Sequence, residues 1–135
     1  MYNQKVMEVF ANPQHMGFIE DNDGVGKVGN ATCGDIMEIS LKIKDDVITD
    51  AKFRTFGCAA AIATSSVATG MVIGMTVEEA LKLTNAKVVE YLEGLPPQKI
   101  HCSVLAEEAI KAAIENYYER TGKKKPDGDG SVKYV

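Results

Sequence analysis

Apolar residues occupy every second position over residues 37–43, and charged or hydroxyl residues stand between them. This period of two predicts a strand with one buried face. A polar turn at residues 44–46 and a β-prone segment at residues 47–56 follow, so an antiparallel hairpin is expected. A further short strand is expected around residues 25–28, between glycines, inside a loop over residues 11–32.

Helical periodicity dominates after Gly57, and only one helix is expected before it. Asn3 is expected to cap that early helix over residues 4–10, and Asn12-Pro13 to end it. The first helix of the second half is expected over residues 59–73. It is alanine-rich and apolar on all sides, which places it at the centre of the core.

Three further helices are expected toward the end of the chain. Thr76 and Glu79 form a capping box that opens a short helix to residue 83, and Asn85 is expected to cap another to residue 92. A long amphipathic helix is expected from the segment after the prolines to about residue 120, with Gly122 as its stop. Its inner stripe is expected to contain Leu105, Ala109, Ala113, Ile114 and Tyr117.

Strands followed by helices are typical of the α+β class, here a small antiparallel sheet with helices packed on one face. The 135 residues fit one compact domain, which is expected over residues 1–122. The tail over residues 123–135 combines a lysine run with proline and Gly-Asp-Gly, and it is expected to be disordered.

Charge and composition exclude several classes of function. The 45% hydrophobic content and the net charge of −4 describe an ordinary globular domain without the basic face of a nucleic-acid-binding protein. No apolar run reaches the length of a membrane span, and residues 1–10 lack the apolar stretch of a secretion signal. A cytoplasmic location with no membrane partner is therefore expected. In that reducing compartment the three cysteines stay free for metal binding or chemistry.

The three cysteines all stand at predicted element boundaries. Cys33 precedes the first long strand, Cys58 separates the second strand from the apolar helix, and Cys102 falls in the first turn of the last helix. Free N–H groups at a helix N-terminus favour a thiolate. Asp35 and His101 stand beside two of the cysteines as further metal-binding groups. The residues alone predict a three-thiolate metal site, against the alternative that each cysteine is a small buried hydrophobe.

Three separated segments carry a resemblance to a known family. Cys33-Gly34-Asp35, Phe56-Gly57-Cys58 and the run Leu95-Pro96-Pro97-Gln98-Lys99-Ile100-His101-Cys102-Ser103 resemble, in order and context, the signature segments of the IscU family. That family includes the amino-terminal scaffold domain of NifU. The resemblance covers residues 1–118 and implies an α+β fold with a three-stranded sheet and helices packed on one side.

The resemblance implies a scaffold on which a [2Fe–2S] cluster is assembled and from which it passes to apo iron–sulfur acceptor proteins. It implies that Cys33, Cys58 and Cys102 bind the iron, with Asp35 or His101 as a fourth ligand. Cys102 matches the cysteine that accepts persulfide sulfur from a cysteine desulfurase, while other donors bring iron and electrons. The same side chains can hold zinc tetrahedrally. A second copy of the chain can also supply a ligand, so a homo-oligomer is one alternative for the oligomeric state.

The segment between the last two helices resembles a partner-binding site of the same family. Leu95, Pro96, Pro97, Gln98 and Lys99 resemble the stretch that an Hsp70-type chaperone and its J-protein partner recognise. Gln98 stands where many chaperone-dependent members carry valine. The alternative for this segment is a rigid turn that leads into the final helix.

Two rival functions fit parts of the same sequence. Zinc-dependent sulfur acceptors of the SufU type carry an insertion between the second and third cysteines and lack the histidine before the third. This chain has His101 and no obvious extra segment there. An interaction module with structural zinc would instead unfold when the metal is removed. The chain is expected to act as a scaffold and carrier, not as a turnover enzyme.

Overall fold

The computed structural model describes residues 3–30, 35–56, 59–94 and 100–122. In chain order the elements of this part are α1 (Gln4–Ala11), β1 (Gly24–Asn30), β2 (Asp35–Lys44), β3 (Val47–Phe56), α2 (Ala59–Val72), α3 (Val77–Leu81), α4 (Asn85–Tyr91) and α5 (Ile100–Thr121). The tail predicted for residues 123–135 lies outside the described residues and stays a prediction. Within the described part, no helix combines the length and the apolar character that crossing a membrane requires.

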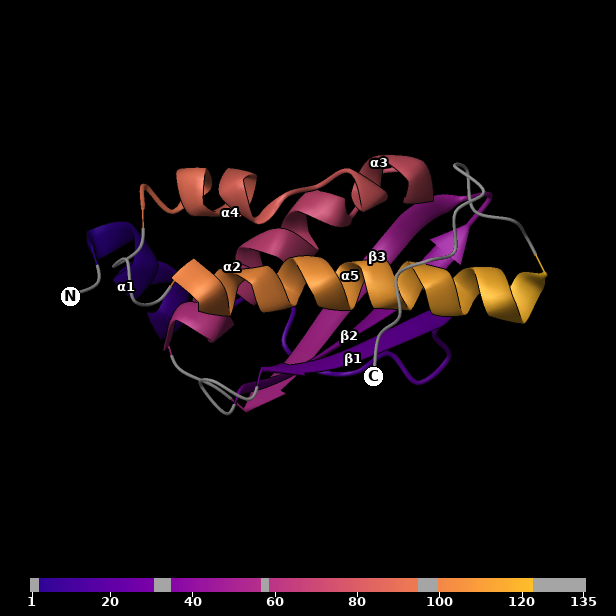
Figure 1. The fold of residues 1–135 in the computed structure, drawn as a ribbon, viewed down its shortest axis with the longest axis horizontal. Coiled ribbons are helices and arrows are strands. Elements are labelled where there is room, and N and C mark those ends of the chain that lie inside the picture. The colour runs from indigo at the N-terminus through magenta and orange to yellow at the C-terminus, as the bar shows by residue number, and fades with distance from the viewer. Residues whose placement is uncertain (1–2, 31–34, 57–58, 95–99, 123–135) are drawn as a thin grey trace.

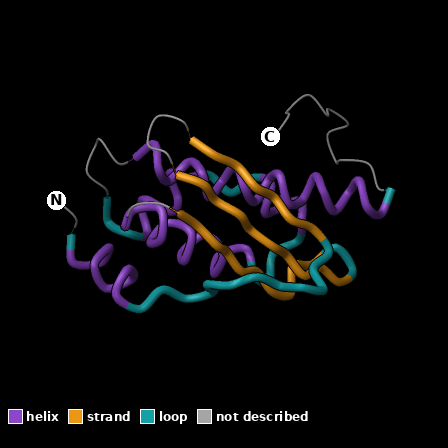
Figure 2. Tube along the Cα trace, turned by 90° about the horizontal axis from the view of Figure 1, so that it is seen from below, coloured by secondary structure: helices purple, strands orange, loops and turns teal. Residues whose placement is uncertain are grey.

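The three strands form one antiparallel sheet with β2 in the middle (Figure 1). Figure 2 looks onto the open face of this sheet, and the helices lie behind it. The inward side chains of β2, among them Met37, Ile39 and Leu41, are fully buried against that helical layer. The predicted α+β fold, with a three-stranded antiparallel sheet and helices packed on one face, is confirmed.

β1 is longer than the predicted strand because glycine occupies two of its inward positions. Gly24, Gly26 and Val28 are the buried positions, so the first half of the strand shows no hydrophobic alternation. A methyl group at Gly26 would lie 2.2 Å from the carbonyl oxygen of Ala109 and 2.4 Å from the amide nitrogen of Ala113. The backbones of β1 and α5 therefore pack directly on each other, with no side chain between them.

Two helices begin at their predicted caps. The Oδ1 atom of Asn3 accepts the N–H of Val6 at 2.9 Å, which caps α1. Thr76 and Glu79 exchange both hydrogen bonds of a capping box at the start of α3. These short side-chain bonds are local in sequence, which is why the pattern alone predicts them.

Two helix boundaries were predicted wrongly. Asn85 is the first residue of α4, and the preceding Thr84, which makes no side-chain cap bond, is the N-cap. The extended backbone of Thr84 sets this boundary. α3 ends at Leu81 rather than at residue 83, because the N–H groups of residues 82 and 83 bind carbonyls three positions back and tighten the last turn.

The loop after α1 occupies the outer edge of β3. Phe53 donates its N–H to the carbonyl of His15 at 2.9 Å, and its own carbonyl accepts the N–H of Gly17 at 2.8 Å. The loop then crosses to the open face of the sheet, where the Oγ of Ser40 accepts the N–H of Ile19 at 3.0 Å. The long loop thus pairs with the sheet edge at the middle of β3.

Candidate functional site

The antiparallel sheet brings two cysteine-bearing connections to one of its ends. Asn30 of β1 pairs with Asp35 of β2, so the connection that contains Cys33 joins two neighbouring residues of the ladder. Ile36 pairs with Phe56, the last residue of β3, and Cys58 follows Phe56 by two positions. Both connections therefore leave the sheet from the same end.

The first turn of α5 lies at that end as well. α5 runs antiparallel to β1, since Gly24 faces Ala113 and Gly26 faces Ala109. From residue 26 to residue 30 the strand advances by about 13 Å, and from residue 109 back to residue 100 the helix advances by about 13 Å. The start of α5 is therefore level with the end of β1. In Figure 1 both lie toward the left, where β3 also ends.

The structure places only part of the predicted ligand set. Asp35 is the first residue of β2, and His101 and Cys102 are the second and third residues of α5. Cys33, Cys58 and the predicted partner segment of Leu95, Pro96, Pro97, Gln98 and Lys99 lie outside the described residues. Among the side chains that are described, no three histidine, cysteine or acidic groups gather to hold a metal ion. The five-residue ligand set stays a prediction.

The helix starts at this end favour negative charge. α2, with 14 residues, begins at Ala59, directly after Cys58, and α5, with 22 residues, has Cys102 in its first turn. The first N–H groups of a helix lack partners within it and carry a partial positive charge, which stabilises a thiolate. Two of the three cysteines are thus next to a helix N-terminus, as the sequence predicted.

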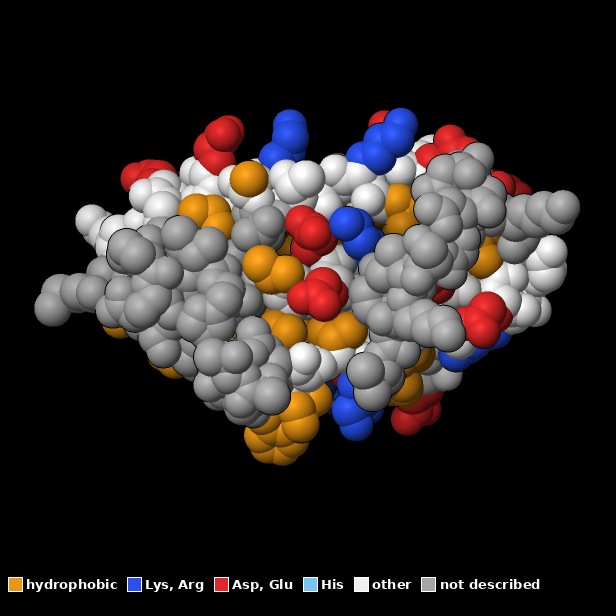
Figure 3. Space-filling view, in the orientation of Figure 1, with side chains coloured by type: hydrophobic (Ala, Val, Ile, Leu, Met, Phe, Trp, Pro, Cys, Tyr) orange, Lys and Arg blue, Asp and Glu red, His pale blue; other side chains and the backbone are white. Residues whose placement is uncertain are grey.

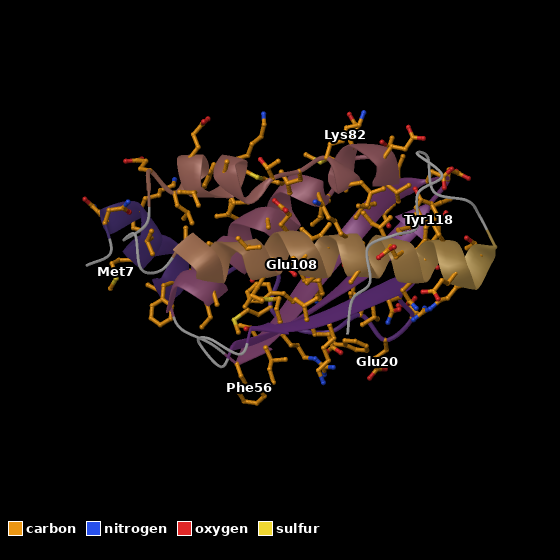
Figure 4. All side chains as sticks on the ribbon, in the orientation of Figure 1. Met7, Glu20, Phe56, Lys82, Glu108 and Tyr118 are labelled. Carbon is orange, nitrogen blue, oxygen red and sulfur yellow. The ribbon has the colours of Figure 1, made fainter. Side chains whose placement is uncertain are left out.

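Exposed apolar side chains border the site on the open face of the sheet, and they were not predicted from the sequence. Phe56 is 81% exposed and its ladder partner Ile36 is 41% exposed. Figure 4 labels Phe56 projecting away from the helices, and Figure 3 shows a hydrophobic group projecting at the same lower edge. The signal was present, because Ile36 precedes the buried Met37 and so points to the opposite face.

Charged residues flank this apolar pair, here named the Ile36–Phe56 patch. Arg54 binds the carboxylate of Glu38, and its guanidinium carbon lies 4.2 Å from the ring centroid of Phe18. The patch borders a hollow of about 440 Å³ lined by Lys27, Ile36, Glu38, Arg54, Thr55 and Phe56. A shape of this kind, apolar at its centre with charges on its rim, is typical of a surface that contacts another protein.

The chain matches the NifU-like N terminal domain family over residues 1–124, nearly its whole length. It belongs to this family. The match includes the segments around all three cysteines, so the resemblance predicted from the signature segments is confirmed.

Named relatives of this NifU-like domain agree with the assignment. The iron–sulfur cluster assembly scaffold protein IscU 1 of Archaeoglobus fulgidus is 58% identical over 123 residues, covering 91% of this chain and 80% of the relative. The iron–sulfur cluster assembly scaffold protein IscU of Haemophilus influenzae is 46% identical over 125 residues, covering 90% of this chain and 98% of the relative. The crystal structure of a NifU-like protein (N-terminal) from Brucella abortus matches with a TM-score of 0.71 at 24% identity, covering 87% of this chain and 94% of that chain. The last similarity supports the fold alone.

Proposed function

We propose that this chain is a scaffold for iron–sulfur cluster assembly that builds a [2Fe–2S] cluster and transfers it to apo-acceptor proteins. The observation that carries the proposal is the convergence of three cysteine-flanking element ends at one end of a NifU-like domain. The 58% identity to a protein named as such a scaffold supports it. Cys33, Cys58 and Cys102 bind the iron, and the cluster is cargo that leaves with the acceptor.

Three thiolates suit a cluster that must be released. A permanently held cluster is usually bound by four thiolates, and this chain has only three cysteines. The fourth position therefore falls to Asp35 or His101, or to a group from another molecule. A carboxylate oxygen binds iron less firmly than a thiolate does. The ligand set can therefore assemble a cluster and still release it.

Cys102 accepts the sulfur in this proposal. Its thiolate attacks the outer sulfur of the persulfide on a cysteine desulfurase, a new S–S bond forms at Cys102, and the donor's cysteine leaves as a thiolate. Two electrons from an external donor then reduce the outer sulfur to sulfide, which regenerates the Cys102 thiolate. The first turn of α5 stabilises that thiolate, which is the reactive form.

Anaerobic reconstitution tests the function directly. Purified protein is incubated with ferrous iron, sulfide and reductant, and its visible absorption, iron content and sulfide content are measured after desalting. We expect a charge-transfer spectrum with equal amounts of iron and sulfide, and transfer of both to an apo-ferredoxin. A protein that retains only zinc and develops no such spectrum would refute the scaffold and support a zinc-dependent sulfur acceptor.

Replacing Asp35 should slow the release of the cluster. In Asp35→Ala the fourth position falls to His101, and an imidazole nitrogen suits iron better than a carboxylate oxygen does. We expect cluster transfer to an apo-acceptor to slow by about tenfold, which corresponds to about 1.4 kcal/mol in the barrier. Asp35→Glu, which keeps a carboxylate, should stay near the wild-type rate. If Asp35→Ala transferred its cluster as fast as wild type does, Asp35 would not be the residue that makes the cluster easy to release.

The Ile36–Phe56 patch is proposed as the docking surface for the cysteine desulfurase. The sulfur donor must bring its persulfide to the end of the sheet where β3 ends and α5 begins, and this patch borders that end. Burying a phenylalanine side chain contributes about 1.5–3 kcal/mol. Phe56→Ser should therefore weaken desulfurase binding by about tenfold or more.

The docking proposal has an internal control. Phe10 on α1 is also exposed, by 39%, and lies on another element. Phe10→Ser should leave the affinity for the desulfurase unchanged, as measured by calorimetric titration. Phe56→Ser should still form a cluster from free iron and sulfide, since that route needs no donor protein. Equal affinities of the two variants would contradict the docking surface.

A further inference from the structure

Asn3 binds two helices at once. Its Oδ1 atom accepts the N–H of Val6 at 2.9 Å and caps α1. Its Nδ2 atom donates to the carbonyl oxygens of Leu92, Glu93 and Gly94 at 2.9, 3.2 and 3.1 Å. Those three residues directly follow α4. A carboxamide has two N–H groups, so the three carbonyls share them.

The turn after α4 presents carbonyls to this donor. The carbonyls of residues 92–94 lie beyond Tyr91, the last residue of α4, and so outside the hydrogen bonds of the helix itself. Glu93 and Gly94 adopt left-handed backbones, with φ of 62° and 106°. For a glutamate that conformation costs roughly 1 kcal/mol. The turn nevertheless brings three successive carbonyls to one side chain, and that side chain is part of the cap of α1.

A second contact joins the same two helix ends. The Nζ atom of Lys5 lies 4.7 Å from the ring centroid of Tyr91, the last residue of α4. Val6 is the fully buried residue of α1, whereas Met7 and Phe10 are exposed by 49% and 39%. α1 is therefore joined to the end of α4 through its first turn, next to α4 in Figure 1, and it also packs on α2. Because Val6 is its one buried residue, the bonds of Asn3 add to what holds this helix in place.

The end of α4 also packs on the helix that carries two of the predicted site residues. Leu92 is fully buried and belongs to the same core cluster as Leu105 and Ala106 of α5. The two helices are in contact within the helical layer. The position of residues 92–94 therefore bears on where the first turn of α5, with His101 and Cys102, lies.

We propose that Asn3 is a positioning residue for the candidate site: its carboxamide joins the start of α1 to the end of α4, which packs on α5, and so helps to position the first turn of α5 with His101 and Cys102. The inference rests on the proposed scaffold function and deepens it. A side chain at the other end of the sequence then sets how firmly the site holds its cluster. The amide serves both helices, since its oxygen accepts a hydrogen bond for the cap and its two N–H groups donate to the carbonyls.

Two substitutions separate the two roles of Asn3. Asn3→Asp and Asn3→Ser both keep an oxygen that caps α1, but Asp has no donor and Ser has one O–H in place of two N–H groups. Asn3→Ala removes the cap as well. Asn12→Ser is the matched control, since Asn12 lies at the other end of α1 and its side chain makes no hydrogen bond to a described residue.

Three readouts are measured on each variant: amide hydrogen exchange at residues 92–94, the alkylation rate of Cys102 in the apo-protein, and the rate of cluster loss to a chelator. For Asn3→Asp and Asn3→Ser we expect each rate to rise by about tenfold, because the net contribution of one or two hydrogen bonds to stability corresponds to a change of that size. Exchange at residues 6–9, inside α1, should stay near wild type in both. Asn12→Ser should match wild type throughout.

The outcomes distinguish this inference from the function on which it rests. If wild type assembles no cluster, the scaffold fails, and exchange and alkylation still decide the role of Asn3. Faster exchange at residues 92–94 with unchanged alkylation and cluster loss would make Asn3 purely structural and overturn the inference. The inference would also be overturned if wild type carries a cluster and Asn3→Ser has the same three rates as wild type.

Discussion

Gly26→Ala is expected to lose at least about 3 kcal/mol of its free energy of unfolding, a large part of the 5–15 kcal/mol typical of a domain. The added methyl group would lie 2.2 Å from the carbonyl oxygen of Ala109 and 2.8 Å from the Cβ of Ala112. Backbone atoms of a long helix cannot move aside as a flexible side chain can. α5 must therefore separate from β1, and the core layer between the sheet and the helices must open. Urea denaturation under reducing conditions measures the loss.

Gly70→Ala is the matched control for this substitution. Gly70 is an exposed residue inside α2, and a methyl group there would meet His15 at 3.5 Å, an ordinary contact distance. Alanine is favoured over glycine in a helix interior by about 1 kcal/mol. The same chemical change is thus expected to stabilise the protein at Gly70 and to destabilise it at Gly26. A Gly26→Ala variant within 1 kcal/mol of wild type would contradict direct backbone packing.

The three cysteines should separate into two classes in serine variants. Cys33→Ser, Cys58→Ser and Cys102→Ser each remove one of three thiolates, and two thiolates should hold less than about a tenth of the wild-type cluster. Only Cys102→Ser should also fail to gain sulfur from a persulfide-loaded desulfurase. Mass spectrometry of the desalted chain detects that sulfur, and absorption spectroscopy detects the cluster.

The sulfur-transfer readout keeps this test independent of folding. A variant that still accepts sulfur from the desulfurase is folded well enough to dock, so loss of its cluster then reports on the ligand alone. Circular dichroism of the three apo-variants provides a second check. Normal cluster content in Cys58→Ser, or sulfur gained by Cys102→Ser, would contradict the roles assigned to these residues.

Elements with local signals were predictable from the sequence, and those built on distant contacts were not. The alternation over residues 37–43 and the capping box of Thr76 and Glu79 involve neighbours along the chain, so β2 and the start of α3 were found. Gly24 and Gly26 have no side chain and therefore add nothing to a hydrophobic pattern. Their role is to let β1 approach the backbone of α5. The true extent of β1 is therefore decided by tertiary packing.

The candidate site shows the same division. The positions of Cys58 and Cys102 beside helix starts followed from periodicity alone, and the structure places the helix starts there. The exposure of Phe56 was missed, although its ladder partner Ile36 precedes the buried Met37 and so marks the opposite face of the sheet. The donors of Asn3 were missed too, because the carbonyls that they bind lie about 90 positions away. A cap was all that the local sequence predicted.

The pairing of Phe53 with residues 15 and 17 has a consequence for how copies of this protein meet in a crowded solution. An unpaired sheet edge is a template on which a second chain can lay a strand, and such growth leads to fibres. Here the middle of the β3 edge is already hydrogen-bonded within the molecule. A neighbouring copy cannot extend the sheet continuously along β3, even if the exposed ring of Phe56 draws it close. The protein can therefore expose the Ile36–Phe56 patch and still resist strand addition along β3.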